Sequence, residues 1–470
     1  MIKKSNGPDV FNAFNERIQA LSNRVSDLSK RMIDTQTGKI GIFFIKQLTD
    51  RTMLSEYIIK PLTESPAQEK NIPASEIASR ILYVDDCAID RESDKIAAYL
   101  LKGCTVILLS WDEDYLAVNI RKIESENSEG PELTYTLRGP KDAFTENLDT
   151  NLSLIRYRIK DEKLKIEMLR AGSRTKTQIA VTYIEGVCDE EVAGEIIKRI
   201  RALDVDGIVE SGKLQSLILN NKYNLFPQMG LIERSDTACS AMLEGKVVVI
   251  VEGSGIALMA PKTFFEFFCS DDDRYDNPYL ATFLKIVRAI ALFISFTLGA
   301  LYIAVVSFHN DTLPSDYILR LAELRADVPF NPITGVFILE IILEILREAL
   351  LRIPQKIGPA IGIAGAIIIG QAAIASGIFS PLLLIIVSTS LLSSFAAPDY
   401  TIITPFRIFK FLMMLLSGIF GLIGFTMGLC FILTTVISVN SFGTAYAYPF
   451  APFQGKALLK RFFGSSSDKE

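Results

Sequence analysis

The sequence predicts an α/β soluble N-terminal region, made of two small α/β lobes, followed by an all-α transmembrane helical domain. Charge is distributed unevenly. Residues 1–284 carry 36 Lys and Arg and 44 Asp and Glu residues, whereas residues 285–470 carry 13 and 10. The second part also contains three long uncharged runs, at 289–308, 357–398 and 411–455. About 20 consecutive apolar residues are enough for one membrane-spanning helix, so these runs predict several spans.

Composition and pattern divide the chain into five expected segments. They are a variable polar helical extension (1–38), a first cytoplasmic α/β lobe (39–176), a second cytoplasmic α/β lobe (177–283), a transmembrane helical domain (284–455) and a cytoplasmic polar tail (456–470). The chain starts with the polar stretch MIKKSNGPDVFNAFNER, which lacks the apolar core of a signal peptide. We therefore expect the N-terminal region to be cytoplasmic.

Strand and helix patterns alternate through the first half, which is typical of α/β domains. The expected elements are a helix at 9–32, a strand at 40–45, a helix at 49–62, a strand hairpin at 105–110 and 115–120, a helix from Asn151 to about Leu169, a strand at 178–186 and a helix at 189–203. The helix starting at Asn151 would carry many cations, namely Arg156, Arg158, Lys160, Lys163, Lys165 and Arg170. They form either a solvated helix face or a docking surface for a partner subunit.

Two short motifs resemble nucleotide-binding loops but depart from them at decisive positions. In GIVESGKL (207–214), Leu214 replaces the hydroxyl residue that would hold Mg²⁺. GSG (253–255) lacks the third glycine of a dinucleotide fingerprint, and KVVVIVEGSGIALMAP predicts two strands joined by a turn. The chain has one histidine, His309, and no C-x-x-C pair. Catalytic and zinc sites usually need such residues, so we expect neither an enzyme nor a cofactor or metal site.

The second half predicts four to six membrane spans. Residues 289–308 fit one span, and 357–398 fit two that are split near Pro381. The stretch 409–439 is either one long tilted helix or a tight hairpin. Basic residues flank these runs at Lys285, Arg288, Arg407, Lys410, Lys456, Lys460 and Arg461. The positive-inside bias places them on the cytoplasmic side, which requires an even number of crossings.

One amphipathic segment, 333–352, carries the candidate functional residues. Glu340, Glu344, Arg347 and Glu348 are spaced so that they share one helix face. A carboxylate facing lipid costs several kcal/mol, so these side chains should face protein or water. Local pairing offsets part of that cost, between Glu344 and Arg347 and between Glu348 and Arg352.

A ridge of small residues follows, at Gly358, Gly362, Ala366 and Gly370, with a strict spacing of four. Such a ridge allows helices to approach closely. The charged face is an amphipathic helix lying at the membrane interface, a salt-bridged contact between subunits, or the lining of a cation path, because rings of acidic side chains in an oligomer favour cations. The ridge serves either ordinary helix packing within one subunit or an oligomer seam or pore wall.

Five long segments together resemble one protein family. They are RGPKDAFTENLDTNLSLIRYRI (138–159), LFPQMGLIERSD (225–236), APKTFFEFFCSDDDRY (260–275), REALLRIPQKIGPAIGIAGAIIIGQAA (347–373) and SFGTAYAYPFAPF (441–453). The chain is identified by these segments as a member of the A subunits of GerA-type spore germination receptors. The resemblance extends from about residue 40 to about residue 460, and residues 1–38 have no counterpart in it.

The resemblance implies a multi-pass protein of the spore inner membrane that is not an enzyme. It also implies a permease-like B subunit, which would bind the germinant, and a lipoprotein C subunit as partners. The A subunit is expected to form a homo-oligomer that acts as a gated ion channel in contact with membrane lipid, without nucleic acid. A secondary transporter or a membrane-anchored signalling scaffold without a pore are the alternatives. Neither the germinant nor the oligomer size follows from the resemblance.

Overall fold

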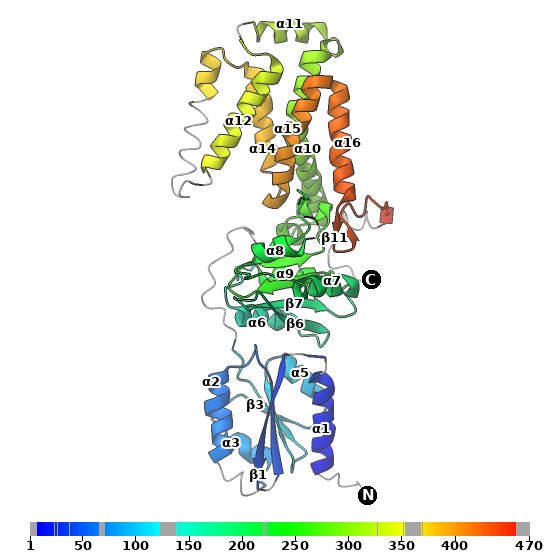
Figure 1. Ribbon diagram of the computed structural model, residues 1–470. Coiled ribbons are helices and arrows are strands. Elements are labelled where there is room, and N and C mark those ends of the chain that lie inside the picture. The colour runs from blue at the N-terminus through cyan, green and yellow to red at the C-terminus, as the bar shows by residue number, and fades with distance from the viewer. Residues whose placement is uncertain are drawn as a thin grey trace. The chain divides into compact units, whose positions relative to one another are not determined.

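The computed structural model describes residues 7–456, with gaps at 23, 26, 37, 65–70, 123–137, 141, 220, 222, 327, 351, 353–367 and 369. The chain folds into two units (Figure 1). Unit 1 comprises Met1–Lys222 and Met229–Lys262, and unit 2 comprises Tyr223–Gln228 and Thr263–Glu470. Unit 1 contains two five-stranded sheets with helices, whereas unit 2 is mainly helical. The predicted fold class is therefore confirmed.

The first sheet of unit 1 has the strand order β1-β2-β4-β5-β3 and is antiparallel throughout. Its strands are β1 (Leu28–Thr35), β2 (Gly38–Ile45), β3 (Cys87–Asp90), β4 (Thr105–Leu109) and β5 (Tyr115–Val118). Helices α1 (Gly7–Ser22) and α5 (Lys95–Leu101) share a core with Phe43 and Val106. Helices α2 (Arg51–Met53), η1 (Leu54–Ile59), α3 (Lys60–Glu64), α4 (Ala74–Glu76) and η3 (Ile77–Ile81) lie over the other face, around Ile42 and Ile107. Alternating side chains of β2, β4 and β5 therefore serve two separate cores.

The helix predicted at 9–32 is wrong in its second half. Helix α1 ends at Ser22, and Leu28–Thr35 forms strand β1, which pairs with β2 along its whole length. A partner strand supplies hydrogen bonds that local periodicity cannot reveal, so tertiary pairing overrides the helical pattern. The apolar face of α1, including Phe14 and Ile18, is buried in the first lobe. Helix α1 and strand β1 are thus part of this lobe and not an extension beside it.

The second sheet has the order β6-β7-β9-β10-β8 and is also antiparallel where strands pair. Its strands are β6 (Leu164–Ala171), β7 (Thr177–Ile184), β8 (Gly230–Ile232), β9 (Val247–Val251) and β10 (Ala257–Ala260). Helices α6 (Leu148–Arg158) and α9 (Ser235–Leu243) share a core with Ile166 and Val248. Helices α7 (Glu190–Arg201) and α8 (Ser211–Ile218) contact strands of the same sheet. The β9–β10 pairing confirms the hairpin predicted for KVVVIVEGSGIALMAP.

The helix predicted from Asn151 to Leu169 is also wrong. Helix α6 begins after Asn147, whose side chain accepts the Thr150 N–H, and it ends at Arg158. Of the charged residues that follow, Lys165 and Arg170 belong to β6, where burial alternates over residues 164–167 and again over 169–171. This period of two is a strand pattern that the density of charges concealed. The lobe boundary predicted at 176/177 falls within the β6–β7 hairpin, so the second sheet begins before it.

A buried ion pair joins the two lobes of unit 1. Arg156 of α6 is fully buried and donates from Nε and from a terminal nitrogen to the two carboxylate oxygens of Asp27, at 3.1 and 2.8 Å. It also donates to the backbone carbonyls of Asp161 and Leu164, each at 3.3 Å. Arg156 therefore does not lie on a solvated helix face.

A second polar cluster of unit 1 predicts a pH-dependent stability. Arg158 donates to both carboxylate oxygens of Asp142, at 2.9 and 2.8 Å, and the Ser235 hydroxyl donates to the same carboxylate at 2.5 Å. Burial acts to raise the pKa of Asp142, but the Ser235 hydrogen bond and the Arg158 pair hold this pKa below its ordinary value. Because the folded pKa is lowered, the stabilisation is complete above the ordinary carboxyl pKa of about 4 and is lost as the pH falls through the folded value.

We therefore expect Asp142→Asn to destabilise this lobe by about 1.5–3 kcal/mol at pH 7 and by less at pH 3.5. Urea titration of the full chain, read by hydrogen exchange of α9 peptides, measures the difference between wild type and variant at each pH. A difference that does not change with pH would contradict this role of Asp142.

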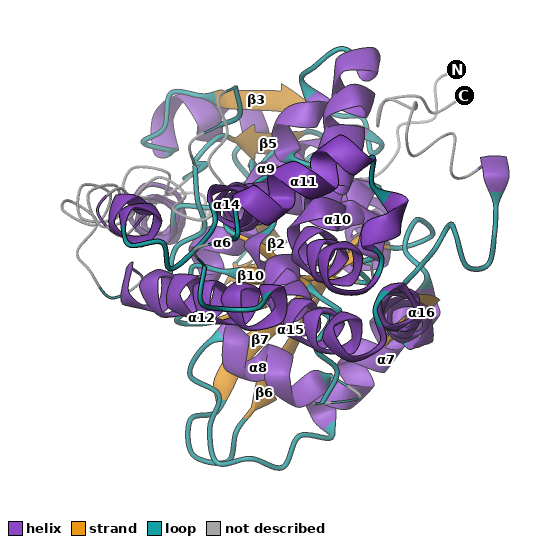
Figure 2. Ribbon diagram, turned by 90° about the horizontal axis from the view of Figure 1, so that it is seen from above, coloured by secondary structure: helices purple, strands orange, loops and turns teal. Residues whose placement is uncertain are grey.

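Unit 2 is a helical bundle around α10 (Pro278–Phe308). Its other long helices within the described part of the chain are α12 (Pro332–Leu350), α14 (Pro381–Ser394), α15 (Ile403–Phe420) and α16 (Leu422–Ser438), and these four contact α10. Helix α11 (Ser315–Glu323) lies across the end of the bundle (Figures 1 and 2). Among the described residues, Pro278–Phe308 and Tyr400–Phe420 are long and apolar enough to cross a membrane. The first of the two spans predicted in 357–398 lies largely outside the described residues, and α14 begins at Pro381, where the second was expected.

The stretch 409–439 consists of two helices, which settles the choice between a long helix and a hairpin. Gly421 separates α15 from α16 with a φ of +61°. A Cβ at this position would lie 2.9 Å from the His309 ring and 3.0 Å from Phe308, so the left-handed conformation and the crowding both require glycine. The two helices then pack against each other.

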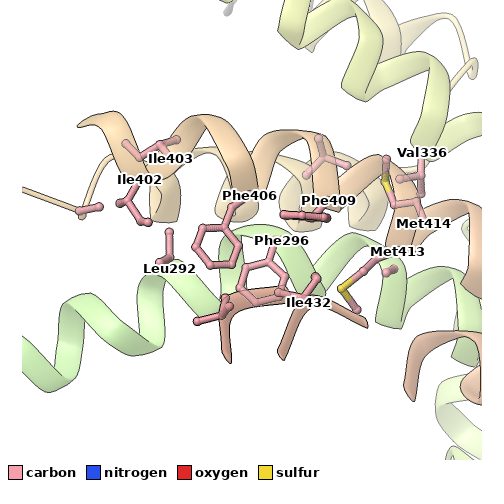
Figure 3. Packing of buried hydrophobic residues seen from close by; sticks show 14 of the residues in the cluster. Leu292, Phe296, Val336, Ile402, Ile403, Phe406, Phe409, Met413, Met414 and Ile432 are labelled. Carbon is pink, nitrogen blue, oxygen red and sulfur yellow. The ribbon is translucent and has the colours of Figure 1, made fainter. Parts of the chain in front are cut away.

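The core of unit 2 is rich in aromatic side chains where α10 and α15 meet. The rings of Phe296 and Phe406 stack with their centroids 4.7 Å apart (Figure 3). Leu292, Ile402 and Ile432 belong to the same buried cluster. Offset-stacked rings of this kind contribute about 0.5–1.5 kcal/mol beyond the burial of their area, so α15 is held firmly against α10.

Candidate functional site

The predicted charged segment is helical, and α12 directs its first carboxylate into the bundle. Glu340 lies in the middle of α12 with 3% of its side chain exposed. The Lys410 ammonium of α15, 9% exposed, lies 2.5 Å from a Glu340 carboxylate oxygen. Burying either charge alone would cost several kcal/mol, and the partner offsets much of that cost. Glu340 thus faces protein, as expected, but its partner comes from a distant part of the chain.

Glu344 lies one helical turn further and binds two arginines. Arg347 of the same helix donates to it at 3.2 Å, which confirms the predicted local pair. Arg407 of α15 donates to both oxygens of Glu344, its Nε at 3.2 Å. The Arg347 guanidinium also lies over the Phe395 ring, 5.7 Å from its centroid. This arrangement places three charged groups in a shared, partly buried network.

Glu348 differs from the other carboxylates of the face. Its pair with Arg352, at 2.6 Å, confirms the second local prediction. Both side chains are largely exposed, 58% for Glu348 and 78% for Arg352. An exposed pair contributes only about 0–1 kcal/mol. Glu348 is therefore the acidic residue of this face whose side chain is largely exposed.

Helices α12 and α15 meet in a regular antiparallel register. We call this contact the charge seam, formed by the pairs Glu340–Lys410 and Glu344–Arg407 together with the apolar contacts Phe337–Phe411 and Ile333–Gly418. The Phe337 and Phe411 ring centroids are 6.3 Å apart. A Cβ on Gly418 would lie 3.2 Å from Ile333 Cγ2, so the helices approach closely at the apolar end. One end of the seam is therefore apolar and the other is ionic.

Arg407 and Lys410 were missed as site residues by the sequence interpretation, which treated them as cytoplasmic charges before the last span. They are three residues apart and share a face of α15, just as Glu340 and Glu344 share a face of α12. Two matched pairs of opposite charge in apolar helices are the signal that could have identified the seam. Which helices would meet was not readable from either segment alone.

The predicted small-residue ridge is mostly untested. Gly358, Gly362 and Ala366 lie outside the described residues. Gly370 lies in a helical stretch, and a Cβ added to it would have no neighbour within 4 Å. Nothing described packs closely against Gly370, so its role as a contact or pore wall stays a prediction. Among the described residues, no group of three or more metal-ligating side chains comes together.

Known proteins resemble the chain over most of its length. The family model of the Bacillus/Clostridium GerA spore germination protein matches residues 16–468, so residues 16–38, which were expected to have no counterpart in the family, do have one. Spore germination protein KA of Bacillus subtilis is 33% identical over 424 residues, which cover 90% of this chain and 78% of that protein. Spore germination protein A1 of the same organism is 33% identical over 406 residues, covering 86% and 83%.

Among solved structures, the chain is similar to the crystal structure of the N-terminal domain of the A subunit of the Bacillus megaterium spore germinant receptor GerK3. It has a TM-score of 0.41 and 24% identity, and covers 53% of this chain and 95% of that chain. The relatives are named as germination proteins, and together with the two long apolar helices they indicate association with a membrane. The chain belongs to the GerA family, the A subunits of spore germination receptors, as its sequence predicts.

Proposed function

We propose that this chain is a membrane subunit of a nutrient germinant receptor and forms, as a homo-oligomer, a gated ion channel. The observation that supports this proposal is the division of the charged face of α12. Glu340, Glu344 and Arg347 are paired within the chain, whereas Glu348 and Arg352 are exposed. Exposed charges on a helix of an apolar bundle need water or another subunit around them. A ring of Glu348 side chains in an oligomer would favour cations.

Membership of the family supports the cellular location and the partner subunits that we propose. The chain would lie in the spore inner membrane as a multi-pass protein with its N-terminal unit in the cytoplasm, together with a permease-like B subunit and a lipoprotein C subunit. Nutrient binding to the B subunit would then be passed to this chain. Within it, the charge seam would hold α12 to α15, and the exposed part of α12 and the small-residue ridge would form the ion path or the contact between copies.

The test compares Glu348→Gln with Glu323→Gln, an exposed glutamate on α11. We expect Glu348→Gln to lower nutrient-triggered cation efflux from spores about threefold or more, because a neutral ring attracts cations less strongly. The amount of chain in the spore membrane should stay unchanged, since an exposed ion pair stabilises little. Efflux equal to that of the Glu323→Gln control would remove Glu348 from the ion path.

Conductance separates the channel from the two alternatives. Purified wild-type oligomers in planar bilayers should pass current, and Glu348→Gln should shift the preference between cations and anions. A secondary transporter or a scaffold without a pore would give no channel current. The paired state of Glu340 and Glu344 favours a scaffold as the second candidate, because their carboxylates serve an internal contact.

A further inference from the structure

The short segment Tyr223–Gln228 belongs to unit 2, although the chain on both sides of it belongs to unit 1. The chain thus leaves the α/β unit, contributes six residues to the helical unit and returns at Met229 to form β8. Both ends of this segment are joined covalently to unit 1, so a rearrangement of unit 1 that shifts Met229 and β8 acts on the segment. The parts of unit 2 that such a rearrangement would move are therefore those that the segment contacts.

Phe226 anchors the segment in the aromatic core of unit 2. Its side chain is almost fully buried, with 1% exposed. Its ring stacks on Phe409 at a centroid distance of 5.5 Å and meets the edge of Phe406 at 5.6 Å. The Tyr446 ring lies 6.1 Å away. Protein cores are close-packed, so Phe226 cannot shift without displacing these rings or leaving a cavity.

Polar contacts hold the backbone of the segment on either side of Phe226. The Asn224 side chain accepts the Phe226 N–H at 3.1 Å, which forms a tight turn. The hydroxyl of Ser441, a fully buried residue of the short strand β11 (Asn440–Ser441), donates to the Gln228 carbonyl at 2.7 Å. The segment is thus built into unit 2 and does not merely pass over its surface.

The same two turns of α15 serve both Phe226 and the charge seam. Phe406 and Phe409 contact Phe226, while the residues that follow each of them, Arg407 and Lys410, pair with α12. Successive helical residues point about 100° apart, so these are two neighbouring faces of one rigid helix. The start of α15 therefore lies between the Phe226 anchor and the two ion pairs.

We propose that Tyr223–Gln228 is the coupling element that passes a rearrangement of unit 1 to α15 and so to the charge seam. The proposal rests on the proposed function in that it assigns the seam a change of state during germination. Phe226 moves the start of α15, and that movement alters the register of Arg407 and Lys410 against Glu344 and Glu340. Packed helices have discrete arrangements, which allows a small displacement at the anchor to select between two of them.

The test uses spores whose receptor contains this chain and a rich nutrient broth as the stimulus. A cysteine pair, Ile333→Cys with Gly418→Cys, reports on the seam at its apolar end, because a Cβ at position 418 would lie 3.2 Å from Cγ2 of Ile333, within reach of a thiol at that position. The broth should change the rate of this cross-link at least threefold when Phe226 is present. With Phe226→Ala, the rate should not respond to the broth, and cation efflux should fall about tenfold. Leu225→Ala, a half-exposed neighbour in the same segment, should leave both readouts unchanged.

The amount of chain in the spore membrane separates coupling from folding. If Phe226→Ala lowers that amount more than twofold, the cross-link response is measured in Phe226→Leu instead. Leucine keeps an apolar anchor but loses the ring contacts. It should leave the amount unchanged and reduce the cross-link response about threefold. The proposal would be overturned if a Phe226 variant that is present at the wild-type amount still gave the full change in cross-linking rate. A seam that responds through Phe226 while Glu348→Gln leaves efflux intact would keep the coupling and reject the ion path.

Discussion

Replacing Lys410 with methionine is expected to remove most of the folded chain from the membrane. The substitution keeps the length of the side chain but leaves the Glu340 carboxylate buried, with 3% exposed, and without its cation. Breaking a buried ion pair in this way costs about 3–5 kcal/mol, a large part of the stability of a typical domain. Thermal unfolding of the purified chain in detergent, together with its amount in the membrane fraction, measures the effect.

Two controls show whether the cost comes from the unpaired charge. The double variant Glu340→Leu with Lys410→Met removes both charges and should recover most of the loss, because well-packed apolar residues can replace a buried pair at little cost. Arg352→Met makes the same chemical change in the exposed pair with Glu348 and should cost about 0–1 kcal/mol. If Lys410→Met behaved like Arg352→Met, the charge seam would not hold α12 to α15.

Replacing Arg156 with methionine is expected to destabilise unit 1 by about 3–5 kcal/mol. The substitution leaves the buried Asp27 carboxylate without the guanidinium that binds both of its oxygens. It also removes the donor to the carbonyls of Asp161 and Leu164. Asp27 lies before β1 in the first lobe, and Arg156 lies in α6 of the second lobe. Without their ion pair, we expect the two lobes to unfold in separate transitions.

The single tryptophan of the chain makes this measurable. Trp111 lies between β4 and β5 in the first lobe, where its ring N–H donates to the Ile72 carbonyl at 2.8 Å. Its fluorescence reports the first lobe, and hydrogen exchange of α9 peptides reports the second. Arg24→Met is the matched control, because its pair with Glu162 joins the same two lobes at 3.7 Å but is exposed. Equal transition midpoints in the Arg156 and Arg24 variants would contradict a structural role for the buried pair.

Sequence patterns predicted local structure well where neighbours along the chain decide it. Strand β2, the β4–β5 and β9–β10 hairpins and helix α7 were expected at nearly their observed positions. The pairs Glu344–Arg347 and Glu348–Arg352 were predictable too, since helix geometry alone brings such residues together. These predictions were accurate because the interactions that decide them extend over no more than one helical turn or one hairpin.

Two of the predictions that were wrong have a different cause. Leu28–Thr35 is a strand because β2 pairs with it, and Arg156 is buried because Asp27 lies opposite it. In both cases the deciding partner is contributed by another element. Residues 164–171 had a strand period, but their charges were assigned to a helix face. In this stretch the alternation of apolar and polar residues indicates the secondary structure, and the number of charges does not.

The sequence by itself determined the fold class, the family and the charged face of α12, because apolar length, helical spacing and long matching segments are properties of the chain order. Only the tertiary structure decided that Glu340 and Glu344 face Lys410 and Arg407 and that Glu348 is left exposed. It also placed Phe226 against the same turns of α15. These contacts depend on the register in which distant helices and loops pack, and that register is set by the fit of whole surfaces and not by any local pattern.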